Sequence, residues 1–392
     1  MKKIVAPLFL LCLWLRVLPQ ADLTGISTWA YQLQNININT IASNPTFHLI
    51  VTDYSYDGTD PMKLSNADVA TVQSSGKKHI SYISIGEAEN YRSYWQSSWS
   101  TSPPSWLGAE NPDWPGNYKV KYWDPAWQNL VFDYVDTIIG QGFDGIYLDI
   151  IDGWYYWQTE VPQAQQVSNA DSLMIDFVLR IRAHVNAVTV NANFIMMPQN
   201  GEDLIFQAGI SGNLRNQYYA AIDAVGIEDV FFTGSNNMDN PYAPDTYRLN
   251  NLAQYQAHGK KVFNIEYLSQ APKIQQYKDT AEHYNFVPYT CDRPLDQLCD
   301  GIATGIKEVP VSSFDIFPNL VIDNKLLVLC RECPVGTKYF IMDLEGRKTE
   351  LTPQAIDMNY SFTIPSAMTN GMYLLVLERN NSPEVRRFVI ER

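Results

Sequence analysis

Carboxylates follow apolar segments of this chain with a regularity that suggests chemistry. The stretch GFDGIYLDIID, residues 142–152, passes from strand-forming residues directly into Asp149 and Asp152. Two carboxyl groups, one protonated and one ionised, are the machinery of glycoside hydrolysis. The simpler interpretation of any one acid at such a place is that it caps the next helix or pairs with an arginine.

Five other apolar segments end in the same way, which makes a set of unrelated caps a weak explanation. Carboxylates that converge raise one another's pKa, which is unfavourable unless the site uses a proton or binds a cation. The sequence therefore predicts an acidic functional site. The polar residues concerned are Asp53, Glu87, Glu89, Asn200, Glu202, Glu228, Asp229 and Glu266.

Aromatic residues cluster beside these acids. Residues 91–127 contain ten Tyr or Trp, among them six of the ten tryptophans of the chain, and residues 154–157 read WYYW. Large rings on the rim of a site are the surfaces on which sugar rings stack. The alternative is that the long insertion packs a small aromatic core of its own. Acids and rim aromatics together favour a carbohydrate ligand.

Eight apolar segments alternate with helical patterns and would position these residues. The alternation over residues 28–291 predicts a (β/α)8 TIM barrel, in which functional residues lie at the carboxyl ends of the strands. A doubly wound open sheet is the alternative, but the glycine-rich phosphate turn typical of it does not occur in the sequence. The predicted strands begin at residues 28, 47, 79, 145, 193, 224, 261 and 285, and the clearest helices span 124–142, 169–188 and 246–261. On the fourth strand, Tyr147 and Asp149 should point inward, with Asp152 just beyond in the loop.

The two terminal regions have sequence patterns that differ from that of the predicted barrel. Residues 1–21 have two lysines and then a short apolar run, which predicts a secretory signal peptide rather than a membrane span. Residues 22–304 would form the barrel. Residues 312–392 read as short alternating strands without a helix, which predicts a small all-β sandwich.

The composition excludes some classes of partner. The net charge of −14 argues against nucleic acid and fits a cationic or neutral ligand, although acidic surfaces also serve solubility. Cys291, Cys299, Cys330 and Cys333 form pairs close in sequence, which predicts disulfides in an exported protein. A zinc site is disfavoured because a second CxxC is missing, and the histidines show no metal-binding spacing. We expect no metal and no cofactor.

Four motifs resemble a known family: YISIGEAENYR (82–92), WPGNY (114–118), GFDGIYLDIID (142–152) and VFNIEY (262–267). They are similar to those of the endo-α-1,4-polygalactosaminidase-like glycoside hydrolases, family 114, over about residues 28–291. This is a barrel family whose members cleave internal bonds of galactosamine-containing polysaccharides. The resemblance implies the same class of reaction here.

The resemblance also assigns roles. It implies that Asp149 and Glu228 are the catalytic pair, with Asp149 as nucleophile or base and Glu228 as general acid; the reverse assignment stays open. Further residues would bind sugar or orient the pair. These are Asp53, Glu89, Arg92, Asn200, Glu266 and Tyr267, together with Glu87, Tyr147 and Asp152 from their places at the strand ends.

This chain departs from the family pattern at several positions near the site. The fungal-type pattern has an acid and a proline at Tyr147 and Leu148, an asparagine at Ile150 and a lysine at Gln199. These departures leave the particular sugar open. A catalytically silent surface protein that binds carbohydrate, and a hydrolase of another extracellular glycan, are the alternative functions.

The C-terminal segments FPNLVIDNKLLV (317–328), YFIMDLEGRK (339–348) and MTNGMYLLVLERNNSPEVRRFVIER (368–392) resemble the sorting domain of type IX secretion. Leu320 stands where that domain usually has a proline. The resemblance implies export by the type IX machinery to the cell surface or medium, with no transmembrane segment in the mature protein. An ordinary sandwich module that binds a glycan is the alternative.

Overall fold

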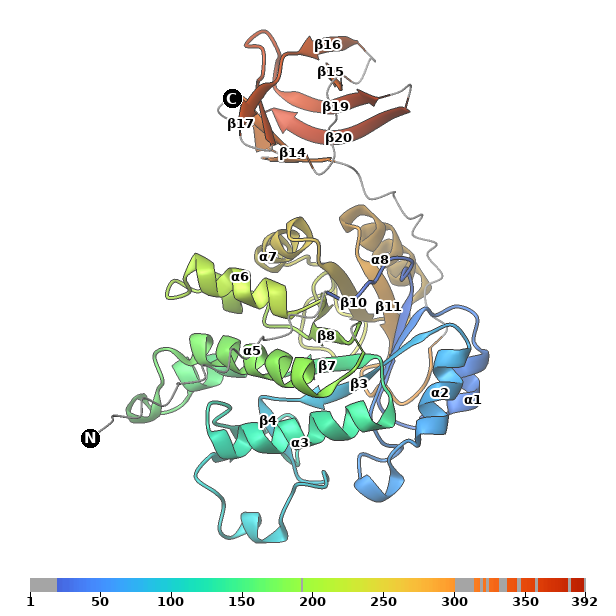
Figure 1. Ribbon diagram of the computed structural model, residues 1–392, viewed down its shortest axis with the longest axis vertical. Coiled ribbons are helices and arrows are strands. Elements are labelled where there is room, and N and C mark those ends of the chain that lie inside the picture. Colours follow the sequence, from blue (N-terminus) through green and yellow to red (C-terminus); the bar gives the residue numbers. More distant parts are fainter. Residues whose placement is uncertain are drawn as a thin grey trace, which may run out of the picture. The chain divides into compact units, whose positions relative to one another are not determined.

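The computed structural model describes residues 20–191, 193–299 and, with short gaps, 314–390. It divides into two compact units, Met1–Ile306 and Lys307–Arg392, which are treated separately (Figure 1). Of the predicted signal peptide, residues 1–19 lie outside the described residues. Across the described chain, no helix is both long enough and apolar enough to span a membrane.

All eight predicted strands of the first unit form. They group into two parallel sheets, one in the order β1-β2-β3-β7-β8 and one in the order β11-β10-β9. The first sheet contains β1 (Trp29–Gln32), β2 (Leu49–Thr52), β3 (Lys78–Ser84), β7 (Gly145–Asp149) and β8 (Ile195–Pro198). The second contains β9 (Ala224–Glu228), β10 (Lys261–Tyr267) and β11 (Val287–Cys291).

The two sheets meet between β8 and β9 through isolated backbone hydrogen bonds. The N–H of Asn200 donates to the carbonyl of Gly226 at 2.9 Å, and the N–H of Asp223 donates to the carbonyl of Met196 at 2.9 Å. Pro198 lies between these bonds and has no N–H to donate, so the ladder is interrupted there. The described residues thus show an α/β fold with two parallel sheets, where the sequence predicts one closed eight-stranded barrel.

A cluster of rings from both sheets fills the interior. The ring of Trp29 on β1 lies 6.2 Å from that of Tyr147 on β7, 5.6 Å from that of Phe263 on β10 and 5.9 Å from that of Tyr289 on β11. Tyr147 is accommodated because Gly226 has no side chain: a Cβ atom there would lie 2.1 Å from the tyrosine hydroxyl oxygen. One hydrophobic core therefore supports both sheets.

Local chemistry sets both ends of one long helix of the first unit. In α3 (Pro125–Gln141), the Asp124 side chain accepts a hydrogen bond from the N–H of Ala126, and Gly142 ends the helix with φ of 89°. Figure 1 shows α3 and α5 packed along the sheet that carries β3 and β7. The remaining helices are α1 (Ile38–Ser43), α2 (Asn66–Ser74), the short α4 (Gly153–Tyr155), α5 (Ala170–Val188), α6 (Gly212–Ala221), α7 (Thr246–Ala257) and α8 (Ala271–Tyr284).

The long insertion after β3 is more ordered than the sequence predicts. It forms an antiparallel sheet in the order β4-β6-β5, from β4 (Glu87–Glu89), β5 (Leu107–Glu110) and β6 (Asn117–Val120). Trp106 lies 5.0 Å from Trp99 and 5.1 Å from Trp127 between ring centroids, and all three rings are buried. These three rings therefore form a local aromatic core, as in the alternative interpretation of the insertion, and do not present a surface to a sugar.

The second unit is all-β, as predicted. Its two sheets have the orders β12-β14-β18-β17 and β13-β20-β19-β15-β16, and their apolar residues form a core of their own. Cys333 lies outside the described residues. The strands are β12 (Phe314–Phe317), β13 (Leu320–Val321), β14 (Lys325–Cys330), β15 (Lys338–Met342), β16 (Lys348–Leu351), β17 (Gln354–Ile356), β18 (Asn359–Thr363), β19 (Gly371–Arg379) and β20 (Ser382–Ile390).

Candidate active site

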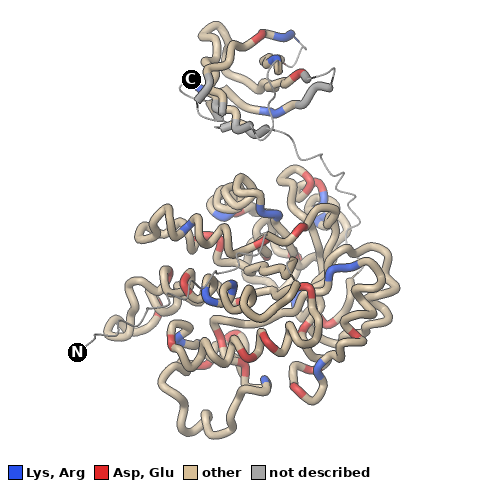
Figure 2. The backbone as a smooth tube through the Cα atoms, in the orientation of Figure 1, with Lys and Arg blue, Asp and Glu red and all other residues tan. Residues whose placement is uncertain are grey.

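A cavity of about 1040 Å³ lies at the carboxyl ends of the strands of the first unit. Its charged lining residues are predominantly acidic, and Figure 2 shows acidic and basic positions along the backbone. The acidic residues that line it are Asp53, Asp57, Glu87, Glu89, Asp113, Asp149, Asp152, Glu160, Asp203 and Glu228, and the basic ones are Arg92, Lys119 and Arg293.

Asp149 ends β7 and lies in the cavity wall. Its Oδ2 accepts a hydrogen bond from the hydroxyl of Tyr82, at 2.8 Å, on the neighbouring strand β3. Burial and the negative charge of Glu228 raise the pKa of Asp149 to about 8. Asp149 therefore holds a proton at neutral pH, and its charge is coupled to that of Glu228.

Glu228 ends β9, and hydrogen bonds hold both of its carboxylate oxygens. The side-chain amide of Asn200 donates to Oε1 at 2.8 Å, and the hydroxyl of Tyr267 donates to Oε2 at 2.6 Å. The guanidinium of Arg248 donates to the Asn200 Oδ1 at 3.2 Å, so the amide nitrogen of Asn200 must face Glu228. Arg248 also donates to the backbone carbonyl of Glu228 at 3.0 Å.

The backbone turns sharply just after β7, β8 and β9. Ile150, Asn200 and Asp229 adopt left-handed conformations, with φ of 59°, 57° and 51°. For a β-branched residue such as Ile150 this conformation is unfavourable, and such strain concentrates at functional sites. The asparagine that the family pattern has at this position tolerates it better.

A buried ion-pair network forms another part of the wall. The Nη1 of Arg92 lies 2.7 Å from Asp53 Oδ2, and its Nε lies 2.6 Å from Glu89 Oε2. Tyr91 donates its hydroxyl to the other Glu89 oxygen at 2.6 Å. Burial raises the pKa of Asp53 to about 6, an effect that Arg92 partly offsets. These groups satisfy one another, so they are suited to shaping the cavity.

Glu87 and Asp152 lie in the wall near Lys119. The ammonium of Lys119 is 2.6 Å from Glu87 Oε1, which also accepts a hydrogen bond from the Asn111 amide at 2.9 Å. Burial and the charge of Glu228 raise the pKa of Asp152 to about 6, while Lys119 lowers it. Both carboxyls line the cavity as the sequence predicts.

Four of the predicted site residues do not line the cavity: Tyr147, Glu202, Asp229 and Glu266. Tyr147 is fully buried in the interior ring cluster. Glu266 is also fully buried, and its carboxylate accepts the N–H groups of Val230 and Phe231 at 2.9 and 2.8 Å. Burial raises the pKa of Glu266 to about 7. Glu266 thus organises the loop after β9. The carboxylate of Glu202 instead pairs with the guanidinium of Arg248 at 2.7 Å.

The site residues that the sequence did not indicate include Tyr82, Arg248 and Arg293. Tyr82 precedes the end of β3 by two residues, so the alternation of that strand could have placed it on the face of Ser84. Arg248 lies on α7 and Arg293 lies beyond β11, where no local pattern marks them.

Nine aromatic side chains line the cavity: Tyr31, Tyr56, Tyr82, Tyr91, Trp114, Trp154, Tyr155, Tyr156 and Tyr267. Of the ten Tyr and Trp in residues 91–127, only Tyr91 and Trp114 are among them. Trp114, Tyr155 and Tyr91 keep 55%, 51% and 44% of their surface exposed. Each of these three rings has an exposed part against which a sugar ring can stack.

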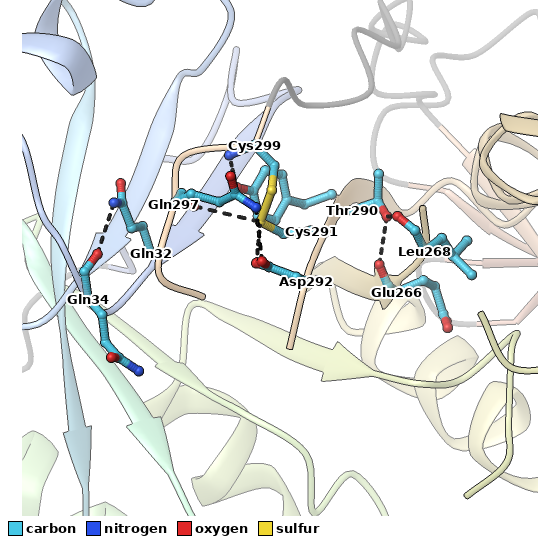
Figure 3. Close-up of a disulfide and its surroundings, with 10 residues drawn as sticks. Gln32, Gln34, Glu266, Leu268, Thr290, Cys291, Asp292, Gln297 and Cys299 are labelled. Carbon is cyan, nitrogen blue, oxygen red and sulfur yellow. Dashed lines mark hydrogen bonds between the residues drawn. A yellow bond between two sulfur atoms is a disulfide. The ribbon is translucent and has the colours of Figure 1, made fainter. Parts of the chain in front are cut away.

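Cys291 and Cys299 form a disulfide at the end of β11, as predicted for a pair close in sequence (Figure 3). Cys291, Asp292 and Cys299 lie close enough together to suggest metal ligands. Since both sulfurs are bonded to each other, they are not available as thiolate ligands.

Comparison with known proteins identifies the family. The profile of glycoside hydrolase family GH114 matches residues 16–307. The uncharacterised protein MJ1477 of Methanocaldococcus jannaschii is 39% identical over 279 residues, which cover 69% of this chain and 77% of that protein. An uncharacterised protein of Thermotoga maritima is 34% identical over 280 residues, covering 69% and 82%. The chain belongs to glycoside hydrolase family GH114.

Solved structures support the fold. The glycoside hydrolase domain of PelA from Pseudomonas aeruginosa has a TM-score of 0.51 and 14% identity, covering 71% of this chain and 99% of that one. Aspergillus fumigatus Ega3, in complex with galactosamine, has a TM-score of 0.51 and 19% identity, covering 71% and 98%. At these identities the likeness concerns the fold alone.

Proposed function

We propose that this protein hydrolyses internal glycosidic bonds of a galactosamine-containing polysaccharide, with Asp149 and Glu228 as the catalytic pair. One observation carries the proposal. The two carboxyls come from strands that are separated by β8, they line one cavity, and the charge of one raises the pKa of the other. The galactosamine bound to Ega3 supports an amino sugar as the substrate.

The pair requires one proton. The raised pKa of Asp149 keeps a proton on this carboxyl at neutral pH, which favours the reverse of the roles that the resemblance implies. In the proposed reaction, Asp149 gives this proton to the glycosidic oxygen as the bond to the anomeric carbon breaks. Glu228 either attacks that carbon or takes a proton from the water that attacks it.

Isosteric amide variants test the pair. We expect Asp149→Asn and Glu228→Gln each to lower kcat on a galactosamine polymer by about 10³-fold or more, since each removes a proton donor or acceptor without changing shape. Asp176→Asn, at an exposed ion pair on α5, is the control. Full activity in either amide variant would remove that residue from the mechanism.

Product stereochemistry gives the second half of the test. A carboxyl separation of about 5–5.5 Å accompanies retention of the anomeric configuration, and about 6.5–9.5 Å accompanies inversion. Proton NMR of the first products distinguishes the two outcomes. The acid is the residue whose amide variant recovers most activity on substrates with good leaving groups, because such substrates do not need protonation.

A panel of defined polysaccharides separates this proposal from its alternatives. Shorter chains, detected by mass, should appear from galactosamine polymers. Tight binding without any product would instead support a silent surface protein, and cleavage restricted to another glycan would keep the reaction class and change the sugar. The acidic lining favours a partly deacetylated, cationic polymer.

We also propose that the protein is exported, with the C-terminal all-β unit as a type IX sorting domain. The compact second unit and its separate core support this, because a sorting domain must fold independently of its cargo. In a host with that machinery, a chain lacking residues 312–392 should accumulate in the periplasm. Unchanged appearance of this truncated chain in the medium would contradict the proposal.

A further inference from the structure

The loop between the disulfide cysteines, residues 292–298, is fastened to the mouth of the cavity. We call it the disulfide loop. The carbonyl of Leu295 accepts the N–H groups of Leu33 and Gln34, at 2.8 and 3.1 Å, from the segment after β1. The Gln34 side chain donates to the carbonyl of Pro294 at 3.2 Å. Figure 3 shows the disulfide bridging the base of the loop.

Arg293 is the residue of this loop that reaches the catalytic machinery. Its Nη2 lies 2.7 Å from Asp229 Oδ2, and its guanidinium lies 4.0 Å from the centre of the Tyr267 ring. Its Nε donates to the carbonyl of Asn237 at 3.2 Å. Arg293 also lines the cavity, where 22% of its side chain is exposed.

These contacts act on Glu228 from two sides. The guanidinium stacks on the ring of Tyr267, so it fixes the plane in which the hydroxyl reaches Glu228 Oε2 at 2.6 Å. The ion pair with Asp229 holds the residue that follows Glu228 directly, in its left-handed conformation. A planar, permanently charged fork can make both contacts at once, whereas a lysine ammonium can make only part of them.

We infer that Arg293 is a positioning residue for Glu228, and that the Cys291–Cys299 disulfide holds Arg293 in place. This inference rests on the proposed role of Glu228 in catalysis. The disulfide closes a loop that has no regular secondary structure. Besides the Arg293 contacts themselves, the loop is held by hydrogen bonds from the segment after β1 and by the buried side chain of Leu295. Opening the disulfide would return conformational freedom to the loop and loosen the Arg293 contacts.

Substitutions of Arg293 test the first part. We expect Arg293→Met to lower kcat by about 10- to 100-fold while KM changes by less than about threefold, because a small displacement of a catalytic group is costly. Arg293→Lys, which keeps the charge, should recover part of the loss. Arg180→Met on α5, which breaks an exposed arginine–aspartate pair, is the matched control and should leave both constants unchanged.

The pH profile separates positioning from general support of the fold. Removing a cation beside the carboxyls favours their protonated form, so the alkaline limb of kcat should move to higher pH in Arg293→Met and return toward the wild-type position in Arg293→Lys. A loss of kcat without any movement of this limb, accompanied by a lower melting temperature, would reduce Arg293 to a structural residue and overturn the inference.

The double variant Cys291→Ser, Cys299→Ser tests the second part. Three other cysteines, Cys12, Cys330 and Cys333, occur in the chain, so serine substitution isolates this disulfide better than a reductant does. We expect the kcat of the double variant to lie between the values of wild type and Arg293→Met. The alkaline limb of its pH profile should move in the same direction as in Arg293→Met. Wild-type kcat and pH profile in the double variant would exclude the disulfide from this role.

The outcomes distinguish this inference from the proposed function. If wild-type protein cleaves the polymer and Arg293→Met cleaves it equally well, the inference fails and the proposed function stands. If wild-type protein cleaves no polymer, the proposed function fails, and a crystal structure of Arg293→Met decides the inference. A Tyr267 hydroxyl still bonded to Glu228 would overturn it, and a displaced ring would support it.

Discussion

The surroundings of Asp149 explain both its cost in stability and its proposed use in catalysis. The carboxyl is surrounded by protein at the end of β7, and Glu228 adds a negative charge to the same cavity. Only the Tyr82 hydroxyl and the N–H of Ile150 favour its ionised form. Groups arranged in this way are retained for function, so removing the ionisable group should stabilise the fold.

The stability of an Asp149→Asn variant should therefore depend on pH in a defined direction. The pKa of Asp149 is about 8 in the folded protein, against 3.8 for an unburied aspartate. Between these values the folded protein binds a proton that the unfolded chain releases, so the free energy of unfolding falls as the pH rises from about 4 to about 8. The variant lacks this dependence. Its melting temperature should exceed that of wild type by a margin that grows from about pH 6 to about pH 8.

Thermal melts at several pH values check this expectation. Asp176→Asn, at an exposed site, serves as the control because its margin over wild type should not grow with pH. A margin for Asp149→Asn that is constant or that shrinks toward pH 8 would show that the carboxyl is already ionised in the folded protein.

At the scale of elements, the insertion between β3 and α3 serves two purposes through residues of the same type. Trp106 is 4% exposed and packs between Trp99 and Trp127. Trp114 lies in the turn between β5 and β6, is mostly exposed and lines the cavity. The small antiparallel sheet thus has an aromatic core that supports it and a ring presented to the ligand.

Alanine substitution should separate these two roles. Trp114→Ala should raise KM for a polysaccharide about tenfold and leave the melting temperature unchanged, since an exposed ring stabilises only the complex. Trp106→Ala should lower the free energy of unfolding by about 3–5 kcal/mol, because it leaves a cavity in a packed core. Kinetics and denaturant melts of both variants provide the check. The reverse pattern would mean that Trp114 supports the sheet.

For the whole molecule, charge is the property most relevant to the substrate. The chain has 42 acidic and 28 basic residues, and the excess of acidic residues is proportionally larger in the cavity lining. An acidic cavity in an acidic protein attracts a polycation from a distance, and dissolved salt screens this attraction. The degree of deacetylation of the polymer should therefore govern its affinity.

Salt dependence tests this idea. Raising ionic strength from about 0.1 M to about 1 M shortens the screening length from about 10 Å to about 3 Å. We expect KM for a deacetylated galactosamine polymer to rise several-fold over this range, while KM for the acetylated polymer stays nearly constant. Equal cleavage of both polymers at low and high salt would remove the electrostatic basis of the preference.

The sequence alone determined the strands, the main helices and the division into an α/β unit and an all-β unit, because these follow from local periodicity, caps and turn residues. It also placed Asp149 and Glu228 at strand ends, where a parallel α/β fold gathers its functional groups. Glu87 and Asp152 could be named because each lies at or near such an end, and Tyr267 because of the family resemblance. All three line the cavity.

Tertiary structure decided which side chains act on one another. Arg248 and Arg293 reach Glu228 and its neighbours from a helix and a loop remote in sequence, and Glu266 turns into the protein to hold backbone N–H groups. Only packing separated the rings of the insertion into buried and exposed ones. Such outcomes depend on distances between elements, and local sequence patterns carry no information about those distances until the chain has folded.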